Sequence, residues 1–599
     1  MNKKMLSLLL SLIVTMFLII KFNLEPLYSI IILVLGSILI NYSLKHSKKK
    51  YNKLSIITSI VLSIIYVICD SLEKTSFINI FNRYLLLNLS GYFVIFYFSI
   101  TNLFMFIDKY KKNKIEDKKI YIGNLEILST SRFSFLVNFI LFFLINILFL
   151  IKFYPGLLTY DSYNELMQAK GVIPLMNNHS ILHSSILMLF VKFGLLFKSV
   201  NIGVFLFLIF QTALVSLTFS YILYFMAKEK VPVLFRVFAA LFFLFHPINI
   251  FYTISLWKDV LFSLSFIIYS ILIYYYSKDK DYFNNKKNII IFIIVSLLVM
   301  YFRNNGVYVV ILSLLVLFIL NRSNYKKILP IFLSIIGLFF ISKLIIFNAL
   351  NIKDYEIKET LSFPSQSIAR IYKYDNNKLT NKEKKEIEKF YSKKIGEVYK
   401  PIISDNTKNE LKQEYLLKHK GDYLKLNFKL FFKYNKRYLE SFINNNYGYY
   451  YMNTYYPSII IDQTDEQGIK HAHIDFLFVM LFLVLIVLFV LLTLLWNLKN
   501  KSNILLFGLL IPVALSMPFK IHDNALVSLL FNIGFYVTIT FLTLLYNIKN
   551  KNNIWYYIPV IILWVSILFS PVYAEFRYLY PVFLLIPVFI GLTMKKVDD

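Results

Sequence analysis

Long apolar runs recur along this chain, and they constrain its fold more than any other feature. Each run is roughly 17 to 25 residues long, which lets an α-helix cross the hydrocarbon core of a bilayer. Such a run is helical in lipid, because lipid offers no hydrogen-bond partner to backbone amides. The sequence therefore predicts an all-α polytopic membrane protein. About sixteen transmembrane helices are expected, at 5–21, 27–43, 54–70, 84–107, 133–153, 201–226, 235–252, 259–276, 287–302, 306–320, 327–347, 474–496, 503–519, 525–546, 554–572 and 577–594.

Positive charge marks one side of these expected helices. The formal net charge is +30, which in a soluble protein would suggest a nucleic-acid partner. Here the lysines gather in short loops between apolar runs, so we expect a lipid bilayer as partner and no nucleic acid. The positive-inside rule places these loops and both termini in the cytoplasm. The basic loops are 44–53, 108–132, 228–236, 278–287, 322–327, 499–501, 549–551 and 595–596.

One further apolar segment, 181–198, would reverse this arrangement if it crossed the membrane. Every later basic loop would then lie on the outer side. The segment also carries His183 and Lys192. We therefore expect an interfacial helix that lies in the membrane plane on the outer face.

The expected topology divides the chain into four regions. Residues 1–132 form a four-helix membrane region, and 133–347 form a membrane core with a large outer loop at 154–200. Residues 348–473 form an extracytoplasmic, α-rich loop domain, and 474–599 form a five-helix membrane region.

Within the loop domain, two stretches stand out by composition. Residues 376–400 are typical of a charged, solvated helix. The tyrosines between Tyr447 and Tyr456 could either stack on sugar rings or pack the loop domain.

The outer loop holds a carboxylate beside the membrane boundary. Asp161 follows the Pro155-Gly156 turn that ends the fifth span, and Glu165 lies four residues further on. A carboxylate there could accept a proton from a hydroxyl group. It equally fits the N-cap of a helix that begins at Ser162.

Two histidines follow in the same loop. His179 and His183 have helical i, i+4 spacing, which could hold a metal ion. Without the glutamate of an HExxH motif, we favour histidines that orient the loop. No cofactor is assigned, and a divalent metal is left open.

Four cations lie on the outer side, where positive charge is otherwise scarce. Such groups suit a phosphate or diphosphate, which arginine can bind through two hydrogen bonds. Snorkelling or local pairing is the alternative, for example Lys258 with Asp259 or Arg577 with Glu575. We favour phosphate binding for the two arginines and snorkelling for Lys520. The four are Lys258, Arg303, Lys520 and Arg577.

The order of these features resembles the GT-C membrane glycosyltransferases, which include the protein O-mannosyltransferase and aminoarabinose transferase families. The resemblance covers about 133–347, with a weaker echo from Glu575 to Pro581. The usual His-Pro-Pro of that group stands here as His179-Ser180-Ile181. The chain is more similar still to an uncharacterised bacterial branch, on Pro155-Gly156…Asp161-Ser162, Trp257-Lys258-Asp259, Arg303-Asn304-Asn305-Gly306, Pro364-Ser365-Gln366-Ser367-Ile368-Ala369-Arg370 and Arg577-Tyr578.

The resemblance implies a GT-C-like fold and an inverting glycosyltransferase on the outer face of a bacterial cell membrane. The donor would be a polyprenyl-phosphate-linked sugar, and the acceptor a glycan, lipid or protein of the cell envelope. Asp161 would be the catalytic carboxylate. A transporter or flippase of lipid-linked glycans and a non-catalytic envelope-assembly protein are the alternatives. Substrate-binding residues would be Glu165, His179, His183, Lys258, Asp259, Arg303, Asn304, Arg577 and Tyr578.

Overall fold

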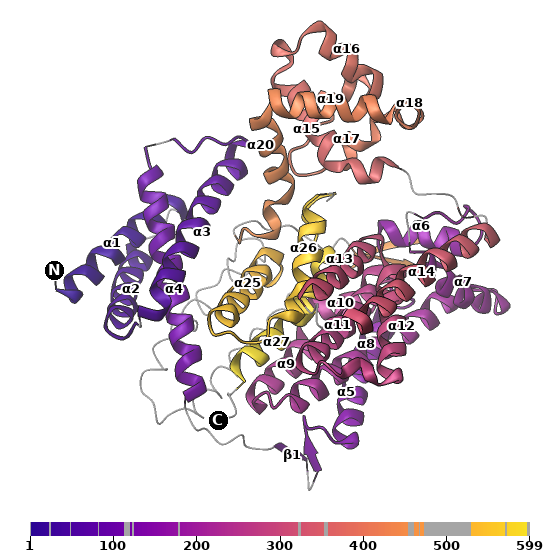
Figure 1. Cartoon of the computed structure of the whole chain (residues 1–599), viewed down its shortest axis with the longest axis horizontal. Coiled ribbons are helices and arrows are strands. Elements are labelled where there is room, and N and C mark those ends of the chain that lie inside the picture. The colour runs from indigo at the N-terminus through magenta and orange to yellow at the C-terminus, as the bar shows by residue number, and fades with distance from the viewer. Residues whose placement is uncertain are drawn as a thin grey trace.

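The computed structural model shows a broad bundle of helices with a smaller helical domain at one end (Figure 1). The structure describes residues 2–22, 26–47, 49–81, 83–112, 120–122, 125–177, 180–320, 325–350, 352, 357–452, 461–465, 468–472, 529–569 and 572–595.

Nine helices within these ranges are long and apolar enough to cross a membrane, which confirms an all-α polytopic membrane protein. They are α1 (Lys3–Phe22), α2 (Pro26–His46), α3 (Lys49–Thr75), α4 (Leu85–Lys112), α5 (Arg132–Lys152), α8 (Val200–Lys228), α11 (Lys258–Lys278), α14 (Tyr325–Ala349), and α27 (Tyr580–Met594) joined to the 3-10 turn η9 (Phe576–Leu579). The expected total of about sixteen stays a prediction, because 474–496 and 503–519 lie outside the described residues.

One expected span, 235–252, is broken. It forms α9 (Val233–Phe245) and α10 (Pro247–Thr253), bent by 53° at the junction. Pro247 has no backbone N–H to continue the first helix, so the chain restarts with His246 as cap. The remaining bundle helices are α12 (Lys286–Phe302), α13 (Asn304–Leu320), α25 (Ile533–Lys549) and α26 (Ile558–Leu568), the last preceded by the 3-10 turn η8 (Trp555–Tyr557).

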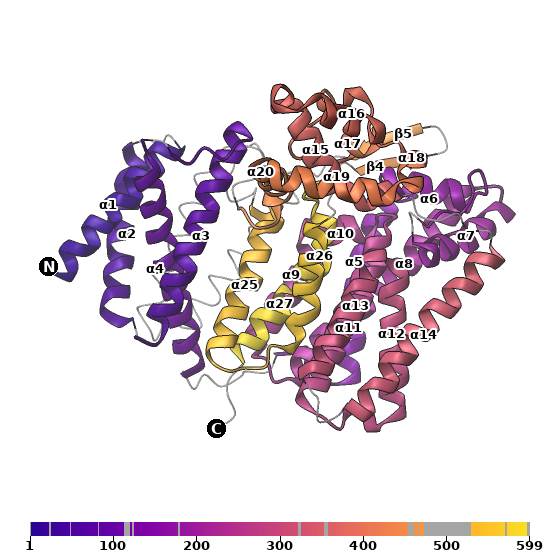
Figure 2. The same ribbon diagram turned by 45° about the horizontal axis from the view of Figure 1, so that its top comes forward.

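The segment expected to be interfacial is the short helix α7 (Ile181–Leu196), which follows α6 (Tyr160–Ala169). It packs closely on α8, where a Cβ added to Gly203 would lie 2.7 Å from the backbone of Phe190. Figure 2 shows α6 and α7 at the edge of the bundle that also carries the loop domain. Their depth in lipid stays a prediction.

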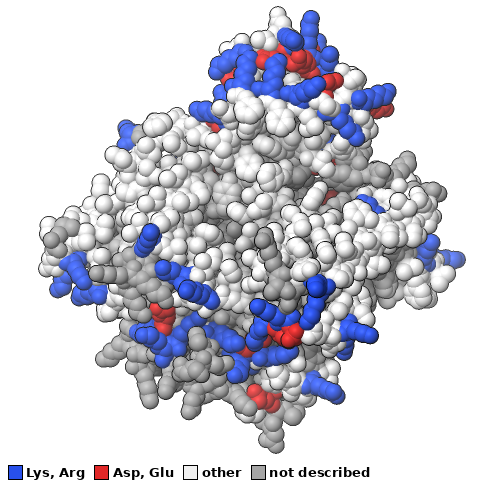
Figure 3. Space-filling view, viewed as in Figure 1, with Lys and Arg blue, Asp and Glu red and all other residues white. Residues whose placement is uncertain are grey.

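Charge is distributed as a membrane protein requires. Figure 3 shows most Lys and Arg on the loop domain and along the opposite edge of the bundle, with smaller groups at the left and right margins and mainly uncharged side chains across the surface between. The last described helix, α27, ends toward that opposite edge (Figure 1). This edge holds the small antiparallel hairpin of β1 (Ile120–Ile122) and β2 (Leu125–Ile127), within an expected basic loop.

The loop domain has a core of its own, which includes Ile368, Ile387, Tyr423 and Leu430. It consists of α15 (Ser362–Tyr374), α16 (Asn381–Phe390), α17 (Asp405–Asn409), α18 (Gln413–Lys418), α19 (Lys420–Lys433) and α20 (Asn435–Asn446), with 3-10 turns η3 (Ile357–Leu361), η4 (Asn376–Lys378), η5 (Lys393–Gly396) and η6 (Tyr447–Tyr449).

The prediction of a single charged helix over 376–400 is wrong. Helix α16 ends at Phe390, because the backbone there leaves the helix and pairs with a neighbouring segment. Lys412 N donates to Phe390 O at 2.7 Å, and Ser392 N donates to Glu410 O at 3.1 Å. One face of the stretch is also buried rather than solvated, because Ile387 packs in the domain core.

The tyrosines that follow α20 pack the protein interior. Tyr447, Tyr449 and Tyr451 are buried, which favours the packing alternative for this part of the tyrosine-rich stretch. Residues 453–456 lie outside the described residues.

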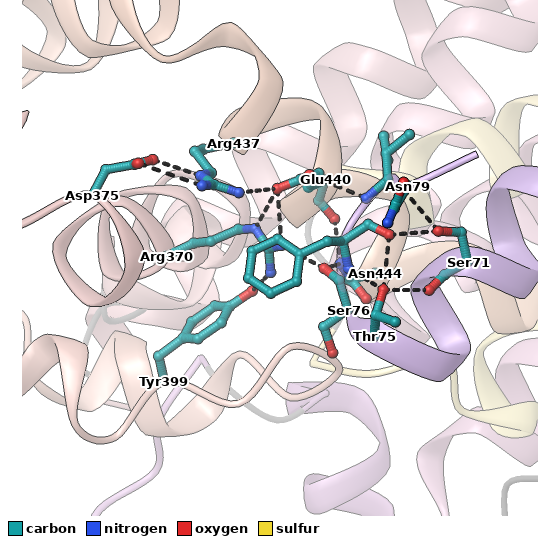
Figure 4. A network of polar contacts seen from close by, with 12 residues as sticks. Ser71, Thr75, Ser76, Asn79, Arg370, Asp375, Tyr399, Arg437, Glu440 and Asn444 are labelled. Atoms are coloured by element: carbon teal, nitrogen blue, oxygen red, sulfur yellow. Dashed lines mark hydrogen bonds and ion pairs between the residues drawn. The ribbon is translucent and has the colours of Figure 1, made fainter. Parts of the chain in front are cut away.

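A buried ionic network joins the loop domain to the N-terminal helices (Figure 4). Arg370 on α15 donates to Glu440 on α20 at 2.9 Å, and both side chains are fully buried. Arg437 donates to Glu440 at 2.9 Å and to Asp375 at 2.5 Å. The hydrogen bond from Arg437 to Asp375 holds the pKa of Asp375 below its ordinary value. Glu440 also accepts from Ile78 N, just after α3, at 3.1 Å.

Candidate active site at the loop-domain end of the bundle

A glycine turn starts the candidate site at the end of α5. Gly156 has φ +135°, and a Cβ there would lie 1.9 Å from Leu208 Cδ1 on α8. The turn lets Leu157 reach the segment before α11, where Leu157 N donates to Ile254 O at 3.0 Å and Leu256 N donates to Leu157 O at 2.9 Å. Two hydrogen bonds of 2.8 Å from Gln211 Nε2, to Thr253 O and Ser255 O, hold that segment in place.

Short strands extend this contact. β3 (Leu157–Leu158) pairs antiparallel with β4 (Ile461–Asp465), which pairs with β5 (Gly468–Ala472). The outer loop and the end of the loop domain therefore share a sheet, which an all-α expectation did not include.

Asp161 is not the cap of α6. The N-cap is Thr159, and it forms a capping box with Ser162. Asp161 stands in the first turn of the helix, where a carboxylate is favoured by the helix dipole. Ser162 Oγ also donates to Leu256 O, so α6 is fixed against the segment that leads into α11.

A chain of ion pairs crosses the site and joins the starts of α6 and α11, the junction of α12 and α13, and the turn η9 before α27. Arg577 Nη1 lies 2.6 Å from Asp161 Oδ2 and 3.9 Å from Asp259 Oδ2. The other oxygen of Asp259 lies 2.6 Å from Arg303 Nη1. Arg577 Nε also pairs with Glu575. Asp161, Arg303 and Arg577 therefore belong to one continuous cluster.

A second arm of the cluster runs into the protein interior. Lys258 Nζ lies 3.6 Å from Asp161 and 3.9 Å from Glu165. Glu165 pairs with His183 on α7, and both of these side chains are buried. The Asp161 side chain keeps 30% of its surface exposed, more than any other of these ion-pairing groups. Asp161 is therefore the carboxylate that a molecule outside the protein reaches first.

Aromatic rings fix the two arginines in place. The guanidinium of Arg303 lies 4.5 Å from the ring centre of Tyr578, and that of Arg577 lies 5.5 Å from Trp257. The ring of Tyr449 is buried next to them, and burial holds the pKa of Tyr449 well above its ordinary value. Burial likewise raises the pKa of Glu575.

The junction of α12 and α13 is tied to the outer loop by two hydrogen bonds. Asn304 Nδ2 donates to Asn177 O at 3.2 Å, and Ser180 Oγ donates to Tyr301 O at 2.9 Å. These bonds hold Arg303 between the loop and α11.

The structure brings together nine of the sequence-predicted site residues, and their chemical roles stay predictions. They are Asp161, Glu165, His183, Lys258, Asp259, Arg303, Asn304, Arg577 and Tyr578. His179 and Lys520 lie outside the described residues. Among the residues that the structure does describe, no group of three or more His, Cys, Asp and Glu side chains has the arrangement of a metal site.

Sequence reasoning missed the roles of Trp257 and Tyr449. Trp257 directly precedes Lys258 and Asp259 in the sequence, and this position could have indicated that it belongs to the site. Tyr449 lies in a tyrosine-rich stretch, and nothing in that composition separates it from its neighbours.

The fold and the site together define a polytopic membrane protein with a cluster of charged side chains at the helix ends on the side of the loop domain. Residues 170–476 match a family described as a family of unknown function (DUF6020), and the chain belongs to that family. No curated protein matches the chain, and no solved structure does.

Proposed function

We propose that this protein is a membrane glycosyltransferase that moves a sugar from a polyprenyl-phosphate donor to a cell-envelope acceptor on the outer face of the membrane. The single observation that carries the proposal is a cluster in which Lys258 and Arg577 both pair with Asp161, while Arg303 joins the cluster through Asp259. The GT-C resemblance assigns the same four residues to sugar transfer.

The chemistry assigns one task to each group. An acceptor hydroxyl attacks the anomeric carbon of the sugar, and its proton passes to the Asp161 carboxylate. The bond between that carbon and the phosphate oxygen breaks, and the lipid phosphate leaves with the electron pair. Lys258, Arg303 and Arg577 stabilise the negative charge of the leaving phosphate. Attack opposite the leaving group inverts the anomeric configuration.

The position of the site suits a donor of this kind. A polyprenyl chain stays in lipid while its phosphate lies at the membrane boundary. The cations stand at the ends of apolar helices, since Lys258 begins α11 and Arg577 lies in the turn η9 that leads into α27. Such helix ends present charge at the depth of the phosphate.

A deletion strain complemented with variants tests the proposal. Asp161→Asn keeps the shape of the side chain but removes the base. We expect mass spectrometry of surface glycans to show loss of one sugar with Asp161→Asn, at unchanged membrane abundance of the protein. Asp281→Asn is the matched control, because Asp281 forms an exposed ion pair with Lys327 in an expected cytoplasmic loop. Unchanged glycans with Asp161→Asn would contradict the assignment of the base.

A further inference from the structure

Helix α19 of the loop domain has two apolar faces, and only one of them packs inside the domain. Tyr423, Leu426 and Leu430 are buried in the domain core. Leu424, Phe428 and Phe432 are 57%, 65% and 72% exposed. These exposed residues follow the i, i+4, i+8 spacing of one helix face, and Phe431 extends that face at 43% exposed.

Lysines border this exposed stripe. At 100° per residue, Lys420 lies on one side of the stripe and Lys425 on the other. Lys429 and Lys433 come next around the helix and pair with Glu383 on α16. An apolar stripe with flanking lysines is the pattern of a helix that lies in a membrane surface, with its rings among the acyl chains and its lysines at the headgroups.

The position of α19 agrees with such a surface. Figure 2 shows α19 running across the direction of the bundle helices rather than along them. The next helix, α20, reaches the outer ends of the bundle helices, where Asn446 Nδ2 donates to Leu568 O of α26 at 2.8 Å. Leu439 on α20 is also exposed.

We infer that α19 is an in-plane membrane helix whose exposed stripe inserts into the outer leaflet of the bilayer that the bundle spans. The partner of this surface is lipid, with anionic headgroups next to Lys420 and Lys425. The loop domain is then held to the membrane at two places, the stripe of α19 and the network of Arg370 and Glu440. This inference does not depend on the proposed function.

Spin-label accessibility in the full chain tests the inference. The background is Cys69→Ala, which removes the one cysteine of the sequence. Labels are placed at Leu424→Cys and Phe432→Cys, in nanodiscs of phosphatidylcholine and phosphatidylglycerol. Leu148→Cys on α5, where Leu148 is 67% exposed, is the lipid reference. Lys382→Cys on α16 is the water reference, because Lys382 is exposed on the loop domain.

In lipid, a label collides readily with oxygen and rarely with a water-soluble nickel complex. We expect the ratio of oxygen to nickel accessibility at both α19 positions to be several-fold above that of Lys382→Cys and close to that of Leu148→Cys. A ratio equal to that of Lys382→Cys would show that water covers the stripe and would overturn the inference. Low accessibility to both reagents would also overturn it, because protein, such as a second copy of the chain, would then cover the stripe.

Discussion

The guanidinium of Arg303 carries more hydrogen-bond donors than its single ion pair uses, and the others can bind a substrate. Its Nη1 binds Asp259, and its guanidinium plane lies against Tyr578. A guanidinium carries five N–H donors, and among the described residues Asp259 is the one carboxylate that pairs with it. Arg303 can therefore bind a phosphate oxygen without first losing its anchor.

Replacing Arg303 by lysine tests this role. Arg303→Lys keeps the charge but removes both the planar fork and the stacking on Tyr578. We expect sugar transfer to fall by roughly tenfold to a hundredfold, with a raised KM for the lipid donor. The measurement is transfer in membranes of the complemented strain. Arg132→Lys, at the exposed start of α5, is the control and keeps full activity. Wild-type KM in Arg303→Lys would remove Arg303 from donor binding.

Gly156 lies at a turn that no side chain fits. Gly156→Ala puts a Cβ into a left-handed backbone and also against Leu208. Gly171 has φ +75° with open space around it, so Gly171→Ala isolates the backbone effect of about 1 kcal/mol. We expect Gly156→Ala to lower the melting temperature in detergent clearly more than Gly171→Ala does. Adding Leu208→Ala to Gly156→Ala should restore part of the lost melting temperature. Equal melting temperatures of the two glycine variants would show that Leu208 moves aside freely.

At the scale of elements, apolar length predicted most of the bundle helices. The run 133–153 became Arg132–Lys152, and 201–226 became Val200–Lys228. Predictions were wrong where backbone contacts from elsewhere decide the outcome. Helix α16 ends at Phe390 because Lys412 binds that carbonyl, and strand β3 exists because β4 pairs with it. Neither partner is visible in the local sequence.

The ionic network of the loop domain makes its stability depend on pH. Because Arg437 holds the folded pKa of Asp375 below its ordinary 3.8, the stabilisation is present above that value and is lost as pH falls through the folded pKa. We expect Asp375→Asn to melt below wild type at pH 6. The difference in melting temperature between Asp375→Asn and wild type should narrow steadily as the pH falls below 3.8. A gap in melting temperature that is independent of pH would mean that Asp375 contributes through packing alone.

At the scale of the whole molecule, loop charge predicted which residues share one side of the membrane. Charge could not indicate which of them meet, because the partners are far apart in sequence. Asp161 and Arg577 are separated by 416 positions. Helix ends such as the starts of α6 and α11 bring their charges together only once the bundle is packed. The sequence therefore predicted the members of the cluster, whereas the pairings of Asp259 with Arg303 and of Glu165 with His183 required the structure.

The central claim is that Asp161 removes a proton so that a sugar leaves its lipid phosphate. The most direct measurement is the pool of polyprenyl-phosphate sugars, by mass spectrometry of lipid extracts from the complemented deletion strain. We predict that one such lipid accumulates with Asp161→Asn but not with Asp281→Asn, while its sugar disappears from the cell surface. An unchanged lipid pool, with that sugar still present on the surface, would contradict the claim.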